Sequence, residues 1–332
     1  MFTRPDAVSD ESVLAAVNSG WDFDAVAVDY LAAGFGSHHW IATDAVGARR
    51  FLTVDDLAAK EFLGLDASAA FDALNQAFRA ARALQTQGLE WVVAPLTGLD
   101  GGVLRWLNDS YSIAVFPYVE GTRFREYASM QERLDVVSLL AQLHQRGDLV
   151  RPSVRAETFH LPNRGDLEAA LRSLDEPWRG GPYAEPTRKL LRADGPAVRQ
   201  SLAVYDQLAA DALHDTSAWT VTHGEPHSAN VLRTSSCLRV IDWDTALLAP
   251  AERDLWMLVR PGDDNRVTGH YTDLTGRSAR AELLALYARW WDLCEVGIYV
   301  AGFRSSHDDT DDSRVAWGGL HEALTTIAAR RP

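Results

Sequence analysis

Lysine is almost missing from this chain. Of its 32 basic residues only Lys60 and Lys189 are lysines, and all the others are arginines. A site that requires a lysine to hold phosphate therefore has two candidate positions in the whole sequence. The excess of arginine and alanine is typical of a GC-rich bacterial genome.

Cysteine and long apolar runs are also scarce. Cys237 and Cys294 stand alone, without the CxxC spacing of a zinc ribbon and too few for a disulfide framework. No run of about 18 apolar residues is present, which argues against a membrane helix, and the first residues, MFTRPDAVSDESV, lack the apolar segment of a signal peptide. We therefore expect a cytoplasmic protein that does not interact with a membrane.

The charge balance is strongly acidic. A formal net charge of -14 argues against a nucleic acid as partner, because such proteins must neutralise phosphates. It is compatible with attraction of a cationic small molecule, and equally with a surface that merely favours solubility. With 332 residues, 47% of them hydrophobic, the chain is long enough for two lobes with a proper core. The oligomeric state is not predicted.

The chemistry is concentrated in residues 219–243, which read WTVTHGEPHSANVLRTSSCLRVIDW. Short apolar segments on either side of Thr-Ser-Ser predict a hairpin. A hairpin brings its ends together, so Asn230 and Asp242 would present an amide oxygen and a carboxylate to one point. Two hard oxygen ligands suit Mg²⁺. Glu225 would then face a substrate hydroxyl beside the metal, which is the layout of a phosphoryl-transfer site.

These motifs resemble those of the aminoglycoside phosphotransferase and choline kinase family, small-molecule relatives of the protein kinases. HGEPHSANVL followed by VIDWD is similar to the family's catalytic loop and metal-binding segment. Five residues match that pattern at the right spacing: His223, Gly224, His227, Asn230 and Asp242. Glu225 stands where the family usually carries aspartate.

The resemblance implies a bilobal, protein-kinase-like α+β fold. Residues 1–118 would form an N-lobe whose small antiparallel sheet covers the nucleotide. Residues 119–332 would form a larger, mostly helical C-lobe with the catalytic loop, the metal site and the acceptor pocket. Asp254 would brace the catalytic loop, and His144 is expected to be a satisfied core residue.

The same resemblance places the nucleotide site. Gly34, Phe35, Gly36 and Ser37 would form the loop over the phosphates, because a backbone without Cβ can approach phosphate oxygens. At the hinge, Pro117 lacks an N–H, so Val119 is the better donor to a base, and Glu120 would reach the ribose. Thr53 occupies the strand position where the family usually carries a phosphate-binding lysine. Lys60 remains an open substitute, although such a lysine is more often solvated.

Periodicity and capping residues predict the remaining elements. We expect helices over 1–20, 68–87, 130–146, 165–174, 186–213 and 279–301, a last helix after 312, three antiparallel strands between 23 and 56, and strands over 89–95 and 111–118. In the aromatic-rich helix, Trp290, Trp291 and Glu295 are candidates for a substrate wall, with core packing as the alternative.

The resemblance implies a phosphotransferase that uses Mg²⁺ and ATP or GTP. Glu225, His227 and Asn230 would be catalytic, and the acceptor would be a hydroxyl of an antibiotic-like aminoglycoside, aminocyclitol or nucleoside. Sugars and amino alcohols stay open as acceptors. Glu225 and the missing strand lysine favour a second reading, a nucleotide-binding protein without efficient turnover. A third reading is a metal hydrolase that uses His223, Glu225 and His227 as ligands.

Overall fold

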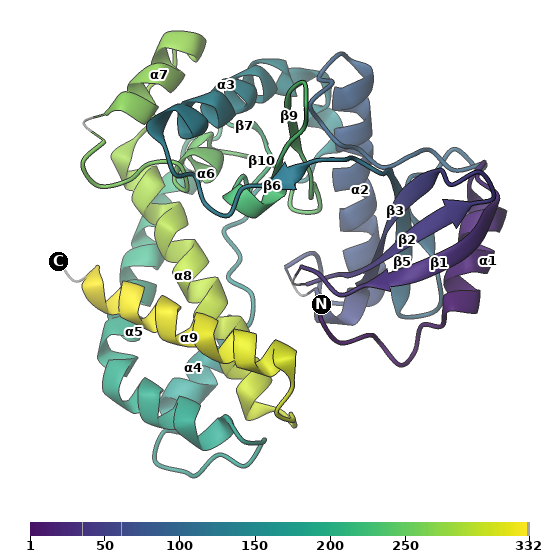
Figure 1. Ribbon diagram of the computed structural model, residues 1–332. Coiled ribbons are helices and arrows are strands. Elements are labelled where there is room, and N and C mark those ends of the chain that lie inside the picture. The colour runs from purple at the N-terminus through teal and green to yellow at the C-terminus, as the bar shows by residue number, and fades with distance from the viewer. Residues whose placement is uncertain (35, 61, 264, 331–332) are drawn as a thin grey trace. The chain divides into compact units, whose positions relative to one another are not determined.

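The computed structural model describes residues 1–34, 36–60, 62–263 and 265–330, which form two compact units. Met1–Glu157 and Ser217–Arg280 make the first unit, and Thr158–Thr216 and Ala281–Pro332 make the second. Figure 1 shows an antiparallel sheet in the N-terminal region and a mainly helical C-terminal region, as predicted for the fold class. These compact units are not the predicted N-lobe and C-lobe. The boundary between the lobes at residues 118 and 119 therefore stays a prediction.

The first unit begins with a five-stranded antiparallel sheet in the order β1-β2-β3-β5-β4. Helix α1 (Asp10–Gly20), capped by Ser9, covers one face, where Val13 and Val17 pack with Leu52 and Val54 of β3. The strands are β1 (Ala25–Leu31), β2 (His38–Asp44), β3 (Arg49–Asp56), β4 (Arg105–Trp106) and β5 (Tyr111–Pro117).

Helix α2 (Ala67–Thr86) covers the opposite face of this sheet. Side chains alternate between faces along a strand, so Ala114 and Phe116 of β5 pack against Leu74 and Phe78 of α2. By the same alternation, Thr53 and Asp55 of β3 lie on the α2 side. A short 3-10 helix (Leu57–Ala59) leads from β3 to Lys60.

Two small sheets carry the catalytic stretch. Strands β8 (Val231–Arg233) and β9 (Leu238–Val240) form the predicted hairpin, and β6 (Thr122–Arg123) adds a third strand beside β8. Strands β7 (Thr220–Thr222) and β10 (Leu247–Ala249) pair separately. The strand predicted over 89–95 is wrong: this described segment makes an isolated bridge from Val92 to Val240, because the edge of β9 offers it a few hydrogen bonds only.

Three helices complete the first unit: α3 (Met130–Arg146), α6 (Glu252–Leu255) and α7 (Arg266–Thr275). Helix α3 has the predicted bounds, and a capping box of Ser129 and Glu132 begins it. A buried ion pair between Arg133 and Asp263, 2.5 Å from Nη1 to Oδ2, ties α3 to the loop before α7. These contacts fix the back of the catalytic loop.

The second unit is a helical group of α4 (Arg164–Arg172), α5 (Ala184–Leu213), α8 (Ala281–Arg304) and α9 (Asp311–Ala329). Helices α4, α5 and α8 were predicted within three residues at either end, and α9 begins at Asp311, close to the last helix expected after residue 312. Helix α8 is the central element, since it packs on α4, α5 and α9. No helix among the described residues is long and apolar enough to cross a membrane.

A buried carboxyl in the second unit gives a pH-dependent prediction. Burial raises the pKa of Asp292 to about 6, although Arg330 lies 2.9 Å from its Oδ2 and opposes the shift. The folded state therefore holds a proton that the unfolded state has lost, so stability from this group is present at low pH and is lost as pH rises through about 6.

We expect the free energy of unfolding of the wild type, relative to Asp292→Asn, to fall by about 2 kcal/mol between about pH 4.5 and 7. Chemical denaturation of both proteins across that range measures the difference. A difference that rises with pH, or stays constant, would contradict the assignment.

Candidate active site

The β8–β9 hairpin brings together the two residues predicted to bind metal. Val231 pairs with Val240, and the Ile241 N–H donates to the Asn230 carbonyl over 3.0 Å. Asp242 follows Ile241 directly. The pairing thus places Asn230 and Asp242 at the same end of the hairpin, as the sequence predicted.

The amide of Asn230 is oriented by its neighbours. Its Nδ2 donates to the Glu225 carbonyl over 3.0 Å and lies 3.2 Å from His227 Nε2. Its Oδ1 makes no hydrogen bond to any described residue. Asn230 is a buried residue, and an amide oxygen that is held in place without a hydrogen bond has the donor chemistry of a ligand for a hard cation.

Asp242 has an uncommon backbone conformation. Its φ is 66°, in the left-handed region that few residues other than glycine adopt. Such strain is concentrated at functional sites. Burial by the surrounding loops, then the charges of Asp244 and Glu225, raise the pKa of Asp242 well above its ordinary value. The residue is nonetheless exposed to solvent, so the two neighbouring carboxylates account for much of this rise in pKa.

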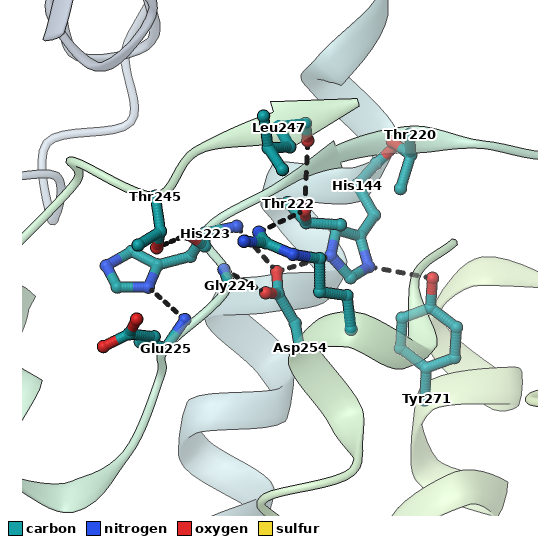
Figure 2. A network of polar contacts seen from close by, with 11 residues as sticks. His144, Thr220, Thr222, His223, Gly224, Glu225, Thr245, Leu247, Asp254 and Tyr271 are labelled. Atoms are coloured by element: carbon teal, nitrogen blue, oxygen red, sulfur yellow. Dashed lines mark hydrogen bonds and ion pairs between the residues drawn. The ribbon is translucent and has the colours of Figure 1, made fainter. Parts of the chain in front are cut away.

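Asp254 braces the catalytic loop from below, as predicted. Its Oδ2 accepts from the His223 backbone N–H over 2.9 Å and its Oδ1 from the Gly224 N–H over 2.6 Å. His144 Nε2 donates to the same carboxylate over 3.0 Å, and its Nδ1 lies 2.9 Å from the Tyr271 hydroxyl. Figure 2 shows this network, in which every polar atom of the His144 ring is satisfied.

The imidazole of His223 is fully engaged in the loop. Its Nε2 donates to the Ile241 carbonyl over 2.9 Å, and its Nδ1 accepts from the Glu225 N–H over 3.1 Å. Burial is the main cause that lowers its pKa, so the ring is neutral. With both nitrogens used, His223 cannot be a metal ligand. The described residues contain no group of three or more histidine, cysteine or acidic side chains placed for a metal, so the metal-hydrolase reading loses its basis.

Glu225 and His227 lie at the mouth of the loop. The side chain of Glu225 is about a quarter exposed, and its Oε2 is 3.9 Å from His227 Nε2. Burial, then the neighbouring His223 ring and the charge of Arg123, lower the pKa of His227 to about 4. His227 is thus a neutral ring that accepts from the Asn230 amide, and its catalytic role stays a prediction.

Gly224 permits this arrangement through both its conformation and its size. Its φ is 102°, and a Cβ there would lie 2.2 Å from Arg253 Nη1. Arg253 is buried and cannot move freely, since it donates to the Thr222 hydroxyl over 3.1 Å. A close backbone approach of this kind requires glycine.

Lys60 is buried in the site rather than solvated. Its Nζ lies 3.0 Å from Asp55 Oδ1 and 2.9 Å from Asp244 Oδ2, with only 3% of the side chain exposed. The Ser37 hydroxyl, 3.1 Å from the ammonium, also donates to Asp55 over 2.7 Å. We call Ser37, Asp55, Lys60 and Asp244 the lysine cluster. It joins the glycine loop, β3 and the metal-binding segment.

The structure thus places the site's lysine seven residues beyond Thr53. Thr53 is a half-buried residue in the middle of β3, paired with His39 and Ala114, and carries no charge. The sequence analysis missed Asp244 and Asp55. The second aspartate of Asp-Trp-Asp was the available signal for Asp244. Burial would raise the pKa of Asp244, but the charge of Lys60 lowers it.

The predicted nucleotide residues are partly described. Gly34 and Gly36 have φ of 75° and 85°, conformations that favour glycine, while Phe35 lies outside the described residues. The Val119 N–H makes no hydrogen bond within the described chain and can donate to a ligand. Glu120 is 82% exposed and pairs with Arg49 Nη2 over 2.8 Å, so a ribose would compete with this arginine. Pro117 ends β5, one residue before the predicted end of this strand.

Trp290, Trp291 and Glu295 belong to α8 in the second unit. Trp290 Nε1 donates to the His160 carbonyl over 3.1 Å, and Glu295 accepts a short hydrogen bond from the Tyr299 hydroxyl. Burial raises the pKa of Glu295. Trp290 and Glu295 thus have partners within their own unit, and the role of all three as a substrate wall stays a prediction.

Comparison with known proteins shows the class of protein to which a chain with this loop and hairpin belongs. The sequence profile of the phosphotransferase enzyme family matches residues 13–294. The chain belongs to this family and is a small-molecule phosphotransferase.

Among curated proteins, the protein StrN of Streptomyces griseus is 31% identical over 259 residues, covering 75% of this chain and 76% of StrN. Among solved structures, spectinomycin phosphotransferase in complex with ADP and spectinomycin superposes with a TM-score of 0.73 at 14% identity, over 97% of this chain and 98% of that one. The choline kinase LicA from Streptococcus pneumoniae gives a TM-score of 0.56 at 16% identity, over 91% and 94% of the chains. At these identities the two structures support the fold.

The lysine cluster predicts unequal reactivity of the two lysines. Burial would lower the pKa of Lys60, but the charges of Asp55 and Asp244 raise it, so a neutral, reactive amine is rare there. Lys189 is exposed. We expect an amine-acetylating reagent to modify Lys60 in the native protein at least about tenfold more slowly than Lys189, measured by peptide mass spectrometry. Equal rates in native protein, after unfolded protein has shown equal labelling, would contradict the cluster.

Gly224→Ala should disturb the loop through a clash as well as backbone strain. We expect a loss of about 2 to 3 kcal/mol in unfolding free energy and a marked loss of activity. Gly262→Ala is the matched control, because Gly262 has a φ of 85° and no heavy atom within 4 Å of an added Cβ. Gly262→Ala therefore introduces the backbone strain without a clash. Similar losses in the two variants would show that the contact with Arg253 does not matter.

Proposed function

We propose that this chain transfers the γ-phosphate of ATP or GTP, with Mg²⁺, to a hydroxyl of an antibiotic-like aminoglycoside, aminocyclitol or nucleoside. The observation that carries the proposal is the hairpin end, where the unpaired Asn230 Oδ1 and the strained Asp242 lie beside a braced loop bearing Glu225. No metal is required to hold that geometry, since hydrogen bonds within the loop already do so.

Asn230 Oδ1 and the Asp242 carboxylate would hold the metal. When bound, Mg²⁺ would neutralise charge on the phosphate oxygens of the donor. The hydrogen bonds of Asn230 Nδ2 keep its amide oxygen turned outward. Because the pKa of Asp242 is raised and a metal ligand must be the carboxylate, metal binding at this residue would depend on pH.

Glu225 would orient the acceptor hydroxyl and accept its proton. The new bond joins the acceptor oxygen to the γ-phosphorus, and the bond from that phosphorus to the bridging oxygen breaks. The longer side chain of glutamate requires a loop held in a fixed place. The Tyr127 hydroxyl supplies one such restraint, donating to the Pro226 carbonyl over 2.8 Å directly after Glu225.

The donor would lie under the glycine loop, with its base near the free N–H of Val119. The lysine cluster ties Ser37 of that loop to Asp244, two residues after the metal ligand. Lys60 thus supports the phosphate site as a positioning residue, from a place on the chain other than the family's usual strand position.

The acceptor class is proposed from family membership and from the neighbours. One similar structure holds spectinomycin, and another is an amicoumacin kinase in complex with AMP-PNP, Ca²⁺ and Ami, with a TM-score of 0.62 at 15% identity over 98% of this chain and 95% of that one. The net charge of -14 suits a cationic acceptor. Trp290, Trp291 and Glu295 are the proposed acceptor residues, and modification of an antibiotic for resistance or self-protection is the proposed role.

The test is nucleotide consumption with Mg²⁺ and ATP or GTP, across a panel of aminocyclitol, aminoglycoside and nucleoside antibiotics. We expect acceptor-dependent turnover that falls at least about 10²-fold in kcat for Glu225→Gln, with little change in KM. Glu225→Asp should lose about 10²-fold, because the carboxylate withdraws by roughly 1 Å. Glu126→Gln, at an exposed carboxylate, is the matched control.

Asp242→Asn should abolish the Mg²⁺ dependence of nucleotide binding. Binding of nucleotide without transfer to any acceptor would favour the alternative of a binding protein without turnover. Full activity of Glu225→Gln would show that Glu225 is not the base. Failure of the wild type to bind any nucleoside triphosphate in the presence of Mg²⁺ would overturn the proposed function.

A further inference from the structure

Tyr271 of α7 lies beside the buried network that braces the catalytic loop. Contacts on either side of it attach α7 to α3. The Ser138 hydroxyl of α3 lies 2.9 Å from His270 Nε2. Further along, Gln145 Nε2 donates to the Leu274 carbonyl over 2.7 Å. Tyr271 stands between these two contacts and is only 1% exposed. The place of its hydroxyl is therefore set by contacts that lie outside the catalytic loop.

The Tyr271 hydroxyl begins a chain of hydrogen bonds that ends on the catalytic loop, as Figure 2 shows. It lies 2.9 Å from His144 Nδ1, and His144 Nε2 donates to Asp254 Oδ2 over 3.0 Å. Asp254 in turn accepts from the backbone N–H groups of His223 and Gly224. The residue that follows Gly224 is the proposed base. Two side chains thus connect the hydroxyl of Tyr271 to the loop that carries this base.

The imidazole of His144 requires a contact at each nitrogen to keep its orientation. The χ2 torsion of histidine has broad wells, so a single hydrogen bond at Nε2 leaves the plane of the ring loosely defined. Tyr271 is the only hydrogen-bond partner of Nδ1 in the described chain, and His144 is 3% exposed, so solvent has little access to it. A hydroxyl can donate or accept, so Tyr271 can hold Nδ1 whether or not that nitrogen carries a proton.

We propose that Tyr271 is a positioning residue for phosphoryl transfer. This inference rests on the proposed function. The hydroxyl fixes the His144 ring, the ring fixes the Asp254 carboxylate, and the carboxylate fixes the backbone before Glu225. A displacement of about 1 Å can cost about 10²-fold in rate, so a smaller displacement passed along this chain would cost about tenfold. In the alternative, the hydroxyl only satisfies a buried imidazole and contributes to stability alone.

The experiment compares Tyr271→Phe with Tyr205→Phe as a matched control. Tyr205 is also 1% exposed, and its hydroxyl donates to the Phe159 carbonyl over 2.6 Å in the second unit. Each variant therefore loses one buried hydroxyl and keeps its ring. The measurements are the free energy of unfolding, and kcat and KM with Mg²⁺, ATP or GTP and the acceptor that the antibiotic panel identifies. Amide hydrogen exchange of His223 and Gly224, measured by NMR without any ligand, reports on the loop directly.

We expect Tyr271→Phe to lower kcat about tenfold, with KM for both substrates within about twofold of the wild type. The His223 and Gly224 amides should exchange about tenfold faster in this variant, because their acceptor is held less firmly. Tyr205→Phe should leave kcat and both exchange rates within about twofold, although it loses a similar amount of stability. In a His144→Gln background, Tyr271→Phe should cause no further loss of kcat, because its route to the loop is already broken.

Wild-type kcat in Tyr271→Phe would show that its hydroxyl contributes to stability alone, and this inference would be wrong. Equal losses of kcat in the two tyrosine variants, or a further loss in the His144→Gln background, would also overturn it. If the wild type transfers phosphate to no acceptor, the proposed function fails. Amide exchange at His223 and Gly224 then still decides whether Tyr271 positions the loop.

Discussion

The active site depends on one buried carboxylate. Asp254 has no exposure to solvent, yet it carries a negative charge that two backbone N–H groups and one imidazole satisfy. Burial alone would raise its pKa, but hydrogen bonding and charge from His144 lower it. A buried charge is costly unless it is fully paired. The backbone at His223 and Gly224 must therefore come to Asp254, and Glu225 is carried to its place as a consequence.

Short contacts connect the loop held by Asp254 to the segment that carries Asp242. His223 links the loop to Ile241 by its ring, and Trp243 packs edge-on against the same ring at 4.7 Å. Asp242 is held between the half-buried Ile241 and the buried Trp243 in a conformation that costs energy. The strain is tolerated because the residues on either side are fixed. The order of the site thus comes from backbone contacts, while its reactive side chains remain open.

The sequence predicted most helices, the order of the first strands and the hairpin, because each depends on local periodicity and caps. Met130 and Arg146 bound α3 as expected, with Ser129 as its cap. The strand predicted over residues 89–95 was wrong because no local signal decides that case. A run of Trp, Val and Val is equally suited to a strand and to an extended core segment. The number of neighbours that an apolar run finds is a tertiary property.

The site shows the same division. Glu225, Asn230 and Asp242 were predictable from their spacing, since one loop and one hairpin hold all three. Lys60 was only an open substitute and was expected to be solvated, because its partner Asp244 lies 184 residues away in sequence. Thr53 was chosen from the usual register, and nothing local to it shows that the cation comes from further along the chain.

The lysine cluster has a thermodynamic consequence. A single ammonium holds Ser37 of the glycine loop and Asp244 of the metal-binding segment, so the energy of each contact depends on the other. Whatever draws Asp244 away from Lys60 also changes the restraint on the glycine loop. Two ligands that act on these two segments are then coupled, and the coupling free energy is the same in both directions. Binding order would follow from affinity and concentration, and not from any fixed sequence of events.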